Sequence, residues 1–175
     1  MTKVIECPNS AYSLDHFFDC KLFLAGGITN CRDWQSELIT SLGEIPELTI
    51  YNPRRKNFNI GDSVVEQEQI VWEYEHLNKC DMLVFCFMES SVCPITLYEL
   101  GRWGNSGSKL MCIMIEPSYP RRIDVELQTM LSRDDVKIFS KLSEVEEWIR
   151  GVMIRYYFGD EPRLQHKRRG RQSNE

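Results

Sequence analysis

The chain has 175 residues, of which 42% are hydrophobic and 27% charged, and its formal net charge is −5. These values predict one globular domain with a core large enough to need no disulfide or metal staple. The negative charge argues against a nucleic-acid-binding surface across the whole domain. The sequence contains no run of eighteen apolar residues, and its first twenty residues lack the basic and apolar regions of a secretory signal. We therefore expect a cytoplasmic protein.

The seven cysteines are odd in number, and several fall within apolar segments that resemble strands. This distribution favours reduced, buried thiols over a disulfide framework. No two cysteines are spaced as CxxC and only three histidines are present, so we expect no metal site. For Cys93, which precedes a predicted helix, a reactive thiol and simple packing are the two alternatives.

The predicted elements alternate between strand and helix along the chain. Residues 1–20 are expected to be an irregular lead-in. Strands are predicted at 21–25, 48–51, 81–87, 109–115 and 136–139. Helices are predicted at 31–42 with Asn30 as cap, and at 63–78, 95–104, 121–131 and 143–157, with Ser143 and Glu146 forming a capping box in the last.

This regular alternation predicts an α/β domain over residues 21–158, with about five parallel strands and helices on both faces of the sheet. Residues 159–175 contain the basic run RLQHKRRGR. We expect a disordered, solvated tail there, and attachment to a nucleic acid or a partner is the alternative.

Two features lie where the first and third long strands end. Open α/β sheets bind their ligands outside the carboxyl ends of the strands. Gly26 and Gly27 follow the first of these strands, where they allow either a close approach of substrate or a tight turn. Glu99 lies in the apolar helix that follows the third of these strands. Its carboxylate is either functional or directed to solvent. A glycine doublet is not the GxGxxG fingerprint, so it predicts no dinucleotide cofactor.

Five motifs occur in order between residues 21 and 115: KLFLAGGIT, DWQ, NPRR, QIVWE eight residues before CD, and PITLYELG. Together they resemble the nucleoside 2-deoxyribosyltransferase-like family. The resemblance implies a flavodoxin-like or Rossmann-like three-layer sandwich that assembles as a homodimer or larger homo-oligomer. It also implies action on the N-glycosidic bond of a nucleoside or nucleotide, without a metal or organic cofactor.

The same resemblance implies roles for two carboxylates. Glu99 matches the glutamate that attacks the anomeric carbon and forms a covalent glycosyl ester. Glu73 matches the acidic residue that protonates the leaving base, although relatives more often have aspartate at this position. Without the resemblance, Glu73 would belong to a solvated helix face.

Further residues are candidates for substrate binding. Asp33 is a candidate to contact a sugar hydroxyl, and Arg54 and Arg55 are candidates to clamp a 5′-phosphate, with ordinary exposed loop arginines as the alternative. Asn52 belongs to the same NPRR motif as the arginines. Asp81 opens the third long strand, where either a substrate contact or hydrogen bonds to loop amides would explain it.

The chain also departs from the family pattern. A tyrosine expected in the first strand is replaced by Leu22, and an aspartate expected six residues before the nucleophile is replaced by Cys93. These differences indicate a divergent branch of the family. Tyr156 and Tyr157 are candidates, by location alone, for completing the pocket of a neighbouring subunit.

The expected function is cleavage or transfer at an N-glycosidic bond through a glycosyl-Glu99 intermediate. One alternative is a nucleoside or nucleotide N-glycoside hydrolase that uses water as acceptor. The other is a non-catalytic nucleotide-binding module.

Overall fold

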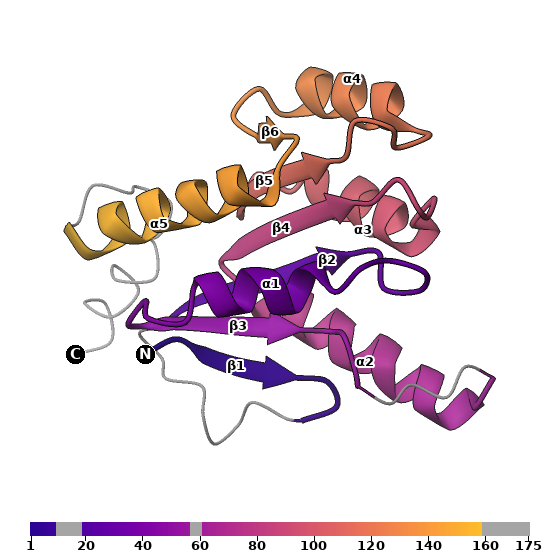
Figure 1. The fold of residues 1–175 in the computed structure, drawn as a ribbon, viewed down its shortest axis with the longest axis horizontal. Coiled ribbons are helices and arrows are strands. Elements are labelled where there is room, and N and C mark those ends of the chain that lie inside the picture. The colour runs from indigo at the N-terminus through magenta and orange to yellow at the C-terminus, as the bar shows by residue number, and fades with distance from the viewer. Residues whose placement is uncertain (10–18, 57–60, 159–175) are drawn as a thin grey trace, which may run out of the picture.

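The computed structural model describes residues 1–9, 19–56 and 61–158. Its strands are β1 (Lys3–Glu6), β2 (Cys20–Gly26), β3 (Leu48–Asn52), β4 (Met82–Phe87), β5 (Leu110–Ile115) and β6 (Lys137–Phe139). Its helices are α1 (Trp34–Ser41), α2 (Ser63–Lys79), α3 (Pro94–Gly104), α4 (Arg122–Ser132) and α5 (Leu142–Phe158). The strands form one sheet in the order β1-β3-β2-β4-β5-β6, and every neighbouring pair is parallel (Figure 1).

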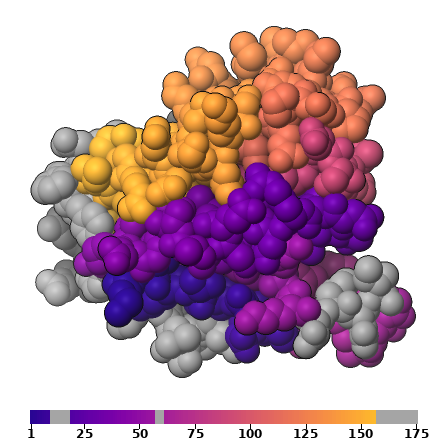
Figure 2. All heavy atoms as spheres, in the orientation of Figure 1, coloured from indigo at the N-terminus to yellow at the C-terminus, as the bar shows by residue number. Residues whose placement is uncertain are grey.

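The helices cover both faces of this sheet and form the predicted three-layer α/β sandwich. On one face, α1 and α5 bury Trp34, Leu38 and Ile149 against strand residues such as Leu22 and Val84. Figure 2 shows these two helices covering the face turned toward the viewer. On the other face, α2, α3 and α4 pack against strand side chains that include Phe23, Phe85 and Ile113. Neighbouring residues of β2 and β4 thus point into different cores, as the period of a strand requires.

The main difference from the predicted fold is the sixth strand, β1, in a segment expected to be irregular. It pairs with β3 from Lys3 opposite Thr49 to Glu6 opposite Asn52. Only Ile5 of its four residues is buried, so the segment has no clear hydrophobic period of its own. Pairing with β3 therefore defines this strand. Residues 10–18 and the basic segment at 159–175 lie outside the described residues.

Two predicted helix caps are corrected by the structure. Helix α1 begins at Trp34, and its cap is Asp33, which accepts a 3.0 Å hydrogen bond from the Ser36 backbone N–H. The predicted cap, Asn30, lies in the preceding turn. At the start of α5, Glu144 accepts the backbone N–H groups of Ser140 and Lys141, whereas Glu146 pairs with Arg150.

The strand order defines where a ligand crevice should form. When β1 is left out, the remaining strands follow the flavodoxin-like order. In this order the chain passes from β2 to β3 on one side of β2 and then returns to β4 on its other side. The connections therefore diverge between β2 and β4, which pair from Leu22 opposite Met82 to Gly26 opposite Cys86. In the part of the chain that the structure describes, no helix has both the length and the apolar character of a membrane span.

Candidate active site

A cavity of about 610 Å³ lies at the carboxyl ends of β2 and β4. Its walls come from the segments that follow β2, β3 and β4 and from the facing sides of α2 and α3. This volume is in the usual range for small-molecule sites. Five of the nine predicted site residues line it: Gly26, Gly27, Arg55, Glu73 and Glu99.

The start of α3 directs Glu99 into this cavity. Cys93 has a left-handed backbone with φ of 51°, which turns the chain into the helix, and Pro94 occupies the first helical position. Proline suits that position because its missing N–H would have no partner within the helix. Thr96 and Glu99, one turn apart, then face the cavity. Burial raises the pKa of Cys93, which favours the neutral thiol over a reactive thiolate.

The two predicted catalytic carboxylates interact electrostatically across the cavity. Burial raises the pKa of Glu99 to about 8, and the charge of Glu73 adds to the increase. Burial also raises the pKa of Glu73, while the hydrogen bond from Gln69 and the positive charge of Arg55 oppose that increase. Burial is therefore the largest influence on the pKa of both carboxylates, and only Glu73 has neighbours that oppose it by favouring the anion.

Glu73 is held in place by Gln69, one turn earlier on α2. The Gln69 Nε2 group donates hydrogen bonds to Glu73 Oε1 at 2.6 Å and to the Pro53 carbonyl oxygen at 2.8 Å. Gln69 is buried and lines the cavity. This arrangement ties the α2 carboxylate to the segment that follows β3.

Gly26 and Gly27 allow two side chains to pack against the backbone after β2. A Cβ atom on Gly26 would lie 2.6 Å from Trp34 Cζ2 and 2.7 Å from the Cys86 carbonyl oxygen. A Cβ atom on Gly27 would lie 2.5 Å from Cys31 Sγ and 2.8 Å from Cys93 Sγ. Packing alone therefore requires glycine at both positions, and the same backbone forms part of the cavity wall.

Arg55 lines the cavity, but its guanidinium group is already engaged. Its Nε and Nη2 atoms lie 3.2 and 3.1 Å from Cys7 Sγ, and Nη2 lies 2.8 Å from Glu68 Oε2. Burial raises the pKa of Cys7 to about 11, so its thiol is neutral. Arg55 thus contributes one partly neutralised positive charge to a cavity that also contains Glu66, Glu73 and Glu99.

Arg54, Asp33 and Asn52 do not line the cavity, in contrast to their predicted substrate contacts. The Arg54 guanidinium donates to Gln35 Oε1 at 3.0 Å and to the Cys31 carbonyl oxygen at 3.1 Å, and it pairs with Asp33. Asn52 Oδ1 accepts the Arg54 backbone N–H at 3.1 Å. These contacts fix the loops beside the cavity, and the Arg54 guanidinium has partners within the chain.

Asp81, Leu22 and Tyr156 also lie away from the cavity. Asp81 precedes β4 at the amino end of the sheet, where its Oδ2 accepts the Lys21 backbone N–H at 3.0 Å. Of the two roles predicted for Asp81, this position favours the hydrogen bond to a backbone amide. Leu22 and Tyr156 belong to the core beneath α1 and α5, so β2 presents Phe23 to the cavity in place of Leu22.

Sequence reasoning missed several lining residues. Glu66 and Gln69 precede Glu73 by seven and four positions on α2, and helical spacing places all three on one face. That spacing was the available signal. Thr96 precedes Glu99 by three positions on α3, so helical spacing is the signal for it as well. Thr29 and Ser91 lie in or just after turns and have no comparable signal.

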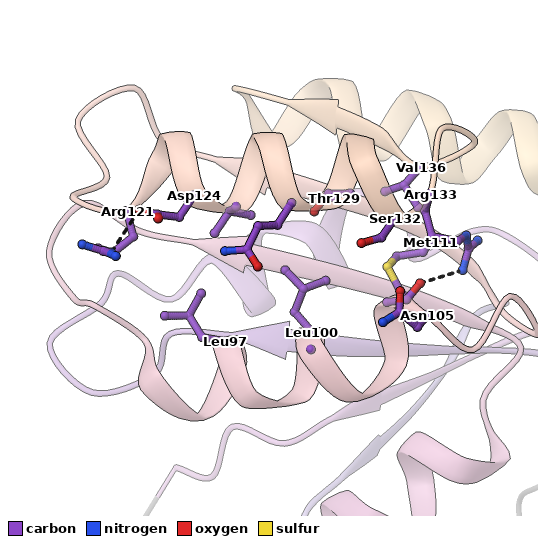
Figure 3. Close-up of a pocket in the computed structure, with 14 residues that line it drawn as sticks. Leu97, Leu100, Asn105, Met111, Arg121, Asp124, Thr129, Ser132, Arg133 and Val136 are labelled. Atoms are coloured by element: carbon purple, nitrogen blue, oxygen red, sulfur yellow. Dashed lines mark hydrogen bonds and ion pairs between the residues drawn. The ribbon is translucent and has the colours of Figure 1, made fainter.

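A second, smaller cavity of about 360 Å³ lies between α3 and α4. Figure 3 shows Leu97 and Leu100 of α3 pointing toward α4 across it. At its ends, Arg121 pairs with Asp124 at 3.1 Å and Arg133 donates to the Gly104 carbonyl oxygen at 3.4 Å. None of the predicted site residues lines this cavity, and we place the candidate active site between α2 and α3.

All seven cysteines are buried, and no disulfide joins them. Within residues 1–9, 19–56 and 61–158, no three histidine, cysteine or acidic side chains gather in a way that could hold a metal ion. A family model described as nucleoside 2-deoxyribosyltransferase like matches residues 19–117, which contain every lining residue of the larger cavity. A search of curated proteins found no match.

Proposed function

Because the chain belongs to the nucleoside 2-deoxyribosyltransferase-like family, we propose that it transfers a 2-deoxyribosyl group between bases through a covalent intermediate on Glu99. The observation that supports this most directly is the pair of carboxylates, Glu73 and Glu99, that share one cavity and interact through their charges. One carboxylate can attack the sugar while the other manages the proton of the base.

In the first step, a carboxylate oxygen of Glu99 attacks the anomeric carbon as the N-glycosidic bond breaks. The electron pair of that bond goes to the base, and Glu73 gives its proton to a ring nitrogen, so that a neutral base leaves. In the second step, a ring nitrogen of another base attacks the same carbon and loses its proton to Glu73. The ester bond to Glu99 breaks as this new bond forms, its electron pair returns to the carboxylate, and two inversions give net retention at the sugar.

This reaction requires a particular distribution of protons between Glu73 and Glu99. With its pKa raised to about 8 by burial and by Glu73, Glu99 holds a proton near neutral pH in the empty site. The reactive form has the opposite arrangement, with Glu99 ionised and Glu73 protonated. A proton that moves from Glu99 to an ionised Glu73 produces this form without exchange with bulk water.

The charges of the cavity favour a substrate without a 5′-phosphate. Three lining side chains are carboxylic acids, whereas Arg55 already pairs with Glu68 and Arg54 is engaged outside the cavity. A phosphate dianion would meet a negative field and no unengaged arginine from this segment. We therefore propose a neutral nucleoside as the substrate, in preference to a nucleotide.

A covalent trap tests the proposed intermediate. The protein is incubated with 2′-deoxynucleosides, with and without a free acceptor base, and base exchange or release is followed by chromatography. A 2-fluoro-substituted analogue should leave one sugar adduct on the peptide that contains Glu99, detected by mass spectrometry. An active Glu99→Ala protein would contradict the assignment, and base release that is unaffected by acceptor would identify a hydrolase.

We also propose that a second copy of the chain covers this cavity. Six large apolar side chains on α2 and α3 are more than half exposed: Val64, Ile70, Val71, Tyr74, Ile95 and Tyr98. Ile70 and Ile95 also line the cavity, so the apolar face is continuous with its mouth. Apolar faces of this kind mark protein interfaces, and a face that borders the site on both helices fits a copy that closes it.

A further inference from the structure

The side-chain amide of Gln69 donates hydrogen bonds through its nitrogen, whereas its oxygen has no hydrogen-bond partner in the part of the chain that the structure describes. Its Nε2 group donates to Glu73 Oε1 and to the Pro53 carbonyl oxygen. Its Oε1 atom is buried and accepts no hydrogen bond from any residue that the structure describes. A buried acceptor without a donor costs free energy comparable to a lost hydrogen bond, so a donor supplied by a ligand would relieve that cost.

The orientation of this amide is determined by its neighbours. In the reverse orientation the amide oxygen would lie 2.8 Å from the Pro53 carbonyl oxygen and 2.6 Å from a carboxylate oxygen of Glu73. Both neighbours are acceptors, so that arrangement would be repulsive. The nitrogen must therefore face Pro53 and Glu73, and the oxygen is the acceptor without a partner among the described residues, on a side chain that lines the cavity.

We infer that Gln69 selects bases that carry an exocyclic amino group next to a ring nitrogen. This inference rests on the proposed function of Glu73 as the proton donor to the base. The Glu73 and Gln69 side chains then present a donor beside an acceptor: the protonated carboxyl of Glu73 and the Oε1 atom of Gln69. Because Glu73 Oε1 already accepts from Gln69, the other carboxyl oxygen carries the proton.

Adenine and cytosine match this pair. Adenine has a ring-nitrogen acceptor, N7, beside its 6-amino donor, and cytosine has N3 beside its 4-amino donor. Hypoxanthine and uracil have a carbonyl oxygen in place of the amino group, and that oxygen would face Gln69 Oε1 as a second acceptor. A well-formed pair of such hydrogen bonds discriminates by about 10- to 100-fold in rate or affinity.

The test compares matched nucleosides that differ only in this group. Values of kcat/KM are measured for 2′-deoxyadenosine against 2′-deoxyinosine, and for 2′-deoxycytidine against 2′-deoxyuridine. We expect the wild type to prefer the amino nucleoside of at least one pair by about 10- to 100-fold. Gln69→Met should reduce this preference to less than about threefold, whereas Gln67→Met, at an exposed position on the same helix, should preserve it. If Gln69→Met lowered activity only by displacing Glu73, kcat/KM would fall equally for both nucleosides of a pair, and the ratio of the two values would stay unchanged.

Binding of free bases separates this inference from the proposed reaction. Calorimetry compares adenine with hypoxanthine and cytosine with uracil, in the wild type and in Gln69→Met. Tighter binding of the amino base that depends on Gln69, without nucleoside turnover, would support base selection and contradict the reaction. Turnover with equal kcat/KM within each pair, or a preference that survives in Gln69→Met, would overturn the role of Gln69. Neither turnover nor binding would overturn both.

Discussion

Glu73 on α2 and Glu99 on α3 face one cavity, and the charge of Glu73 contributes to the raised pKa of Glu99. The two helices start after different strands and bring together residues that are twenty-six positions apart in the sequence. Arg55 and Gln69 lie beside Glu73 and favour its anion, while burial is the main influence on Glu99. The surroundings of the two carboxylates therefore differ, as expected for groups that divide the roles of acid and nucleophile.

The raised pKa of Glu99 should make the stability of the protein depend on pH. An ordinary glutamate releases its proton near pH 4.5, whereas Glu99 in the folded protein releases it near pH 8. Between these values the folded state binds more protons than the unfolded state, so this group lowers stability as the pH rises through that window. Glu99→Gln removes the ionisation and should stabilise the protein by on the order of 2 to 4 kcal/mol at pH 8.5, relative to wild type.

Denaturant unfolding at pH 5, 7 and 8.5 measures this difference. The gain from Glu99→Gln should grow from pH 5 to pH 8.5. Glu75→Gln, which changes a partly exposed glutamate of α2, is the matched control and should show a small difference at every pH. A gain from Glu99→Gln that stays constant with pH would be inconsistent with the burial of an ionisable Glu99.

The proposed role of Glu73 as proton donor predicts a loss of activity that depends on the leaving group. Glu73→Gln should lower kcat/KM for natural nucleosides by about 10²- to 10⁴-fold, the usual contribution of general acid catalysis. A 2-deoxyriboside of 4-nitrophenol needs no protonation to leave, so its kcat/KM should fall by less than about tenfold. Glu99→Gln should abolish turnover of both substrates. Equal losses for both substrates in Glu73→Gln would show that Glu73 is not the acid.

The sequence predicted most of the fold because its strands and helices have clear hydrophobic periods. Strands β2 to β5 have long buried runs, such as the fully buried MLVFCF of β4, and these were placed within one or two residues. Strand β1 was not predicted, because its extended conformation depends on pairing with β3, a contact between distant segments of the chain. Local pattern carries little information on such a contact.

The candidate site was also predicted only in part, because some of its contacts depend on tertiary packing. Glu73, Glu99 and the glycines follow from motif order and from the rule that ligands bind at the carboxyl ends of strands. The role of Arg54 did not follow, because its partners, Gln35 and the Cys31 carbonyl oxygen, are defined only by tertiary packing. Such packing decides whether a loop arginine is available to a ligand.

Gly27 should be intolerant of even one methyl group. In Gly27→Ala the new Cβ would lie 2.5 and 2.8 Å from the Sγ atoms of Cys31 and Cys93, which are themselves buried. Relief requires these side chains or the backbone to move, so we expect a loss of about 1 to 3 kcal/mol in the free energy of unfolding. The same change should lower kcat/KM, since Cys93 and Gly27 both line the cavity.

Chemical denaturation tests this prediction against a glycine with free space around it. No atom lies within 4 Å of a Cβ built on Gly101 in helix α3. Gly101→Ala should therefore stabilise the protein by up to about 1 kcal/mol, the difference in helix propensity. Replacing Cys31 and Cys93 with alanine in the Gly27→Ala protein should recover part of the loss. A stable Gly27→Ala protein would mean that the backbone after β2 is not tightly packed.

The apolar face on α2 and α3 predicts how the protein assembles. Val71 and Tyr98 are 56% and 71% exposed and do not line the cavity. Charged side chains at both positions should disfavour an interface, because they would be buried without partners. Sedimentation at micromolar concentration should show a dimer or larger assembly for wild type and a monomer for Val71→Glu combined with Tyr98→Glu. Since a second copy would close the cavity, kcat/KM should fall in the same variant.

The matched control is Leu131→Glu on α4, which introduces the same charge at a side chain that is 87% exposed. It should leave both the assembly and kcat/KM unchanged, because α4 lies beyond α3 and does not border the site. Dissociation by Leu131→Glu alone would move the interface to α4, away from the cavity. A wild-type protein that remains monomeric at every concentration, with full activity, would show that one chain forms the whole site and that the apolar face has another partner.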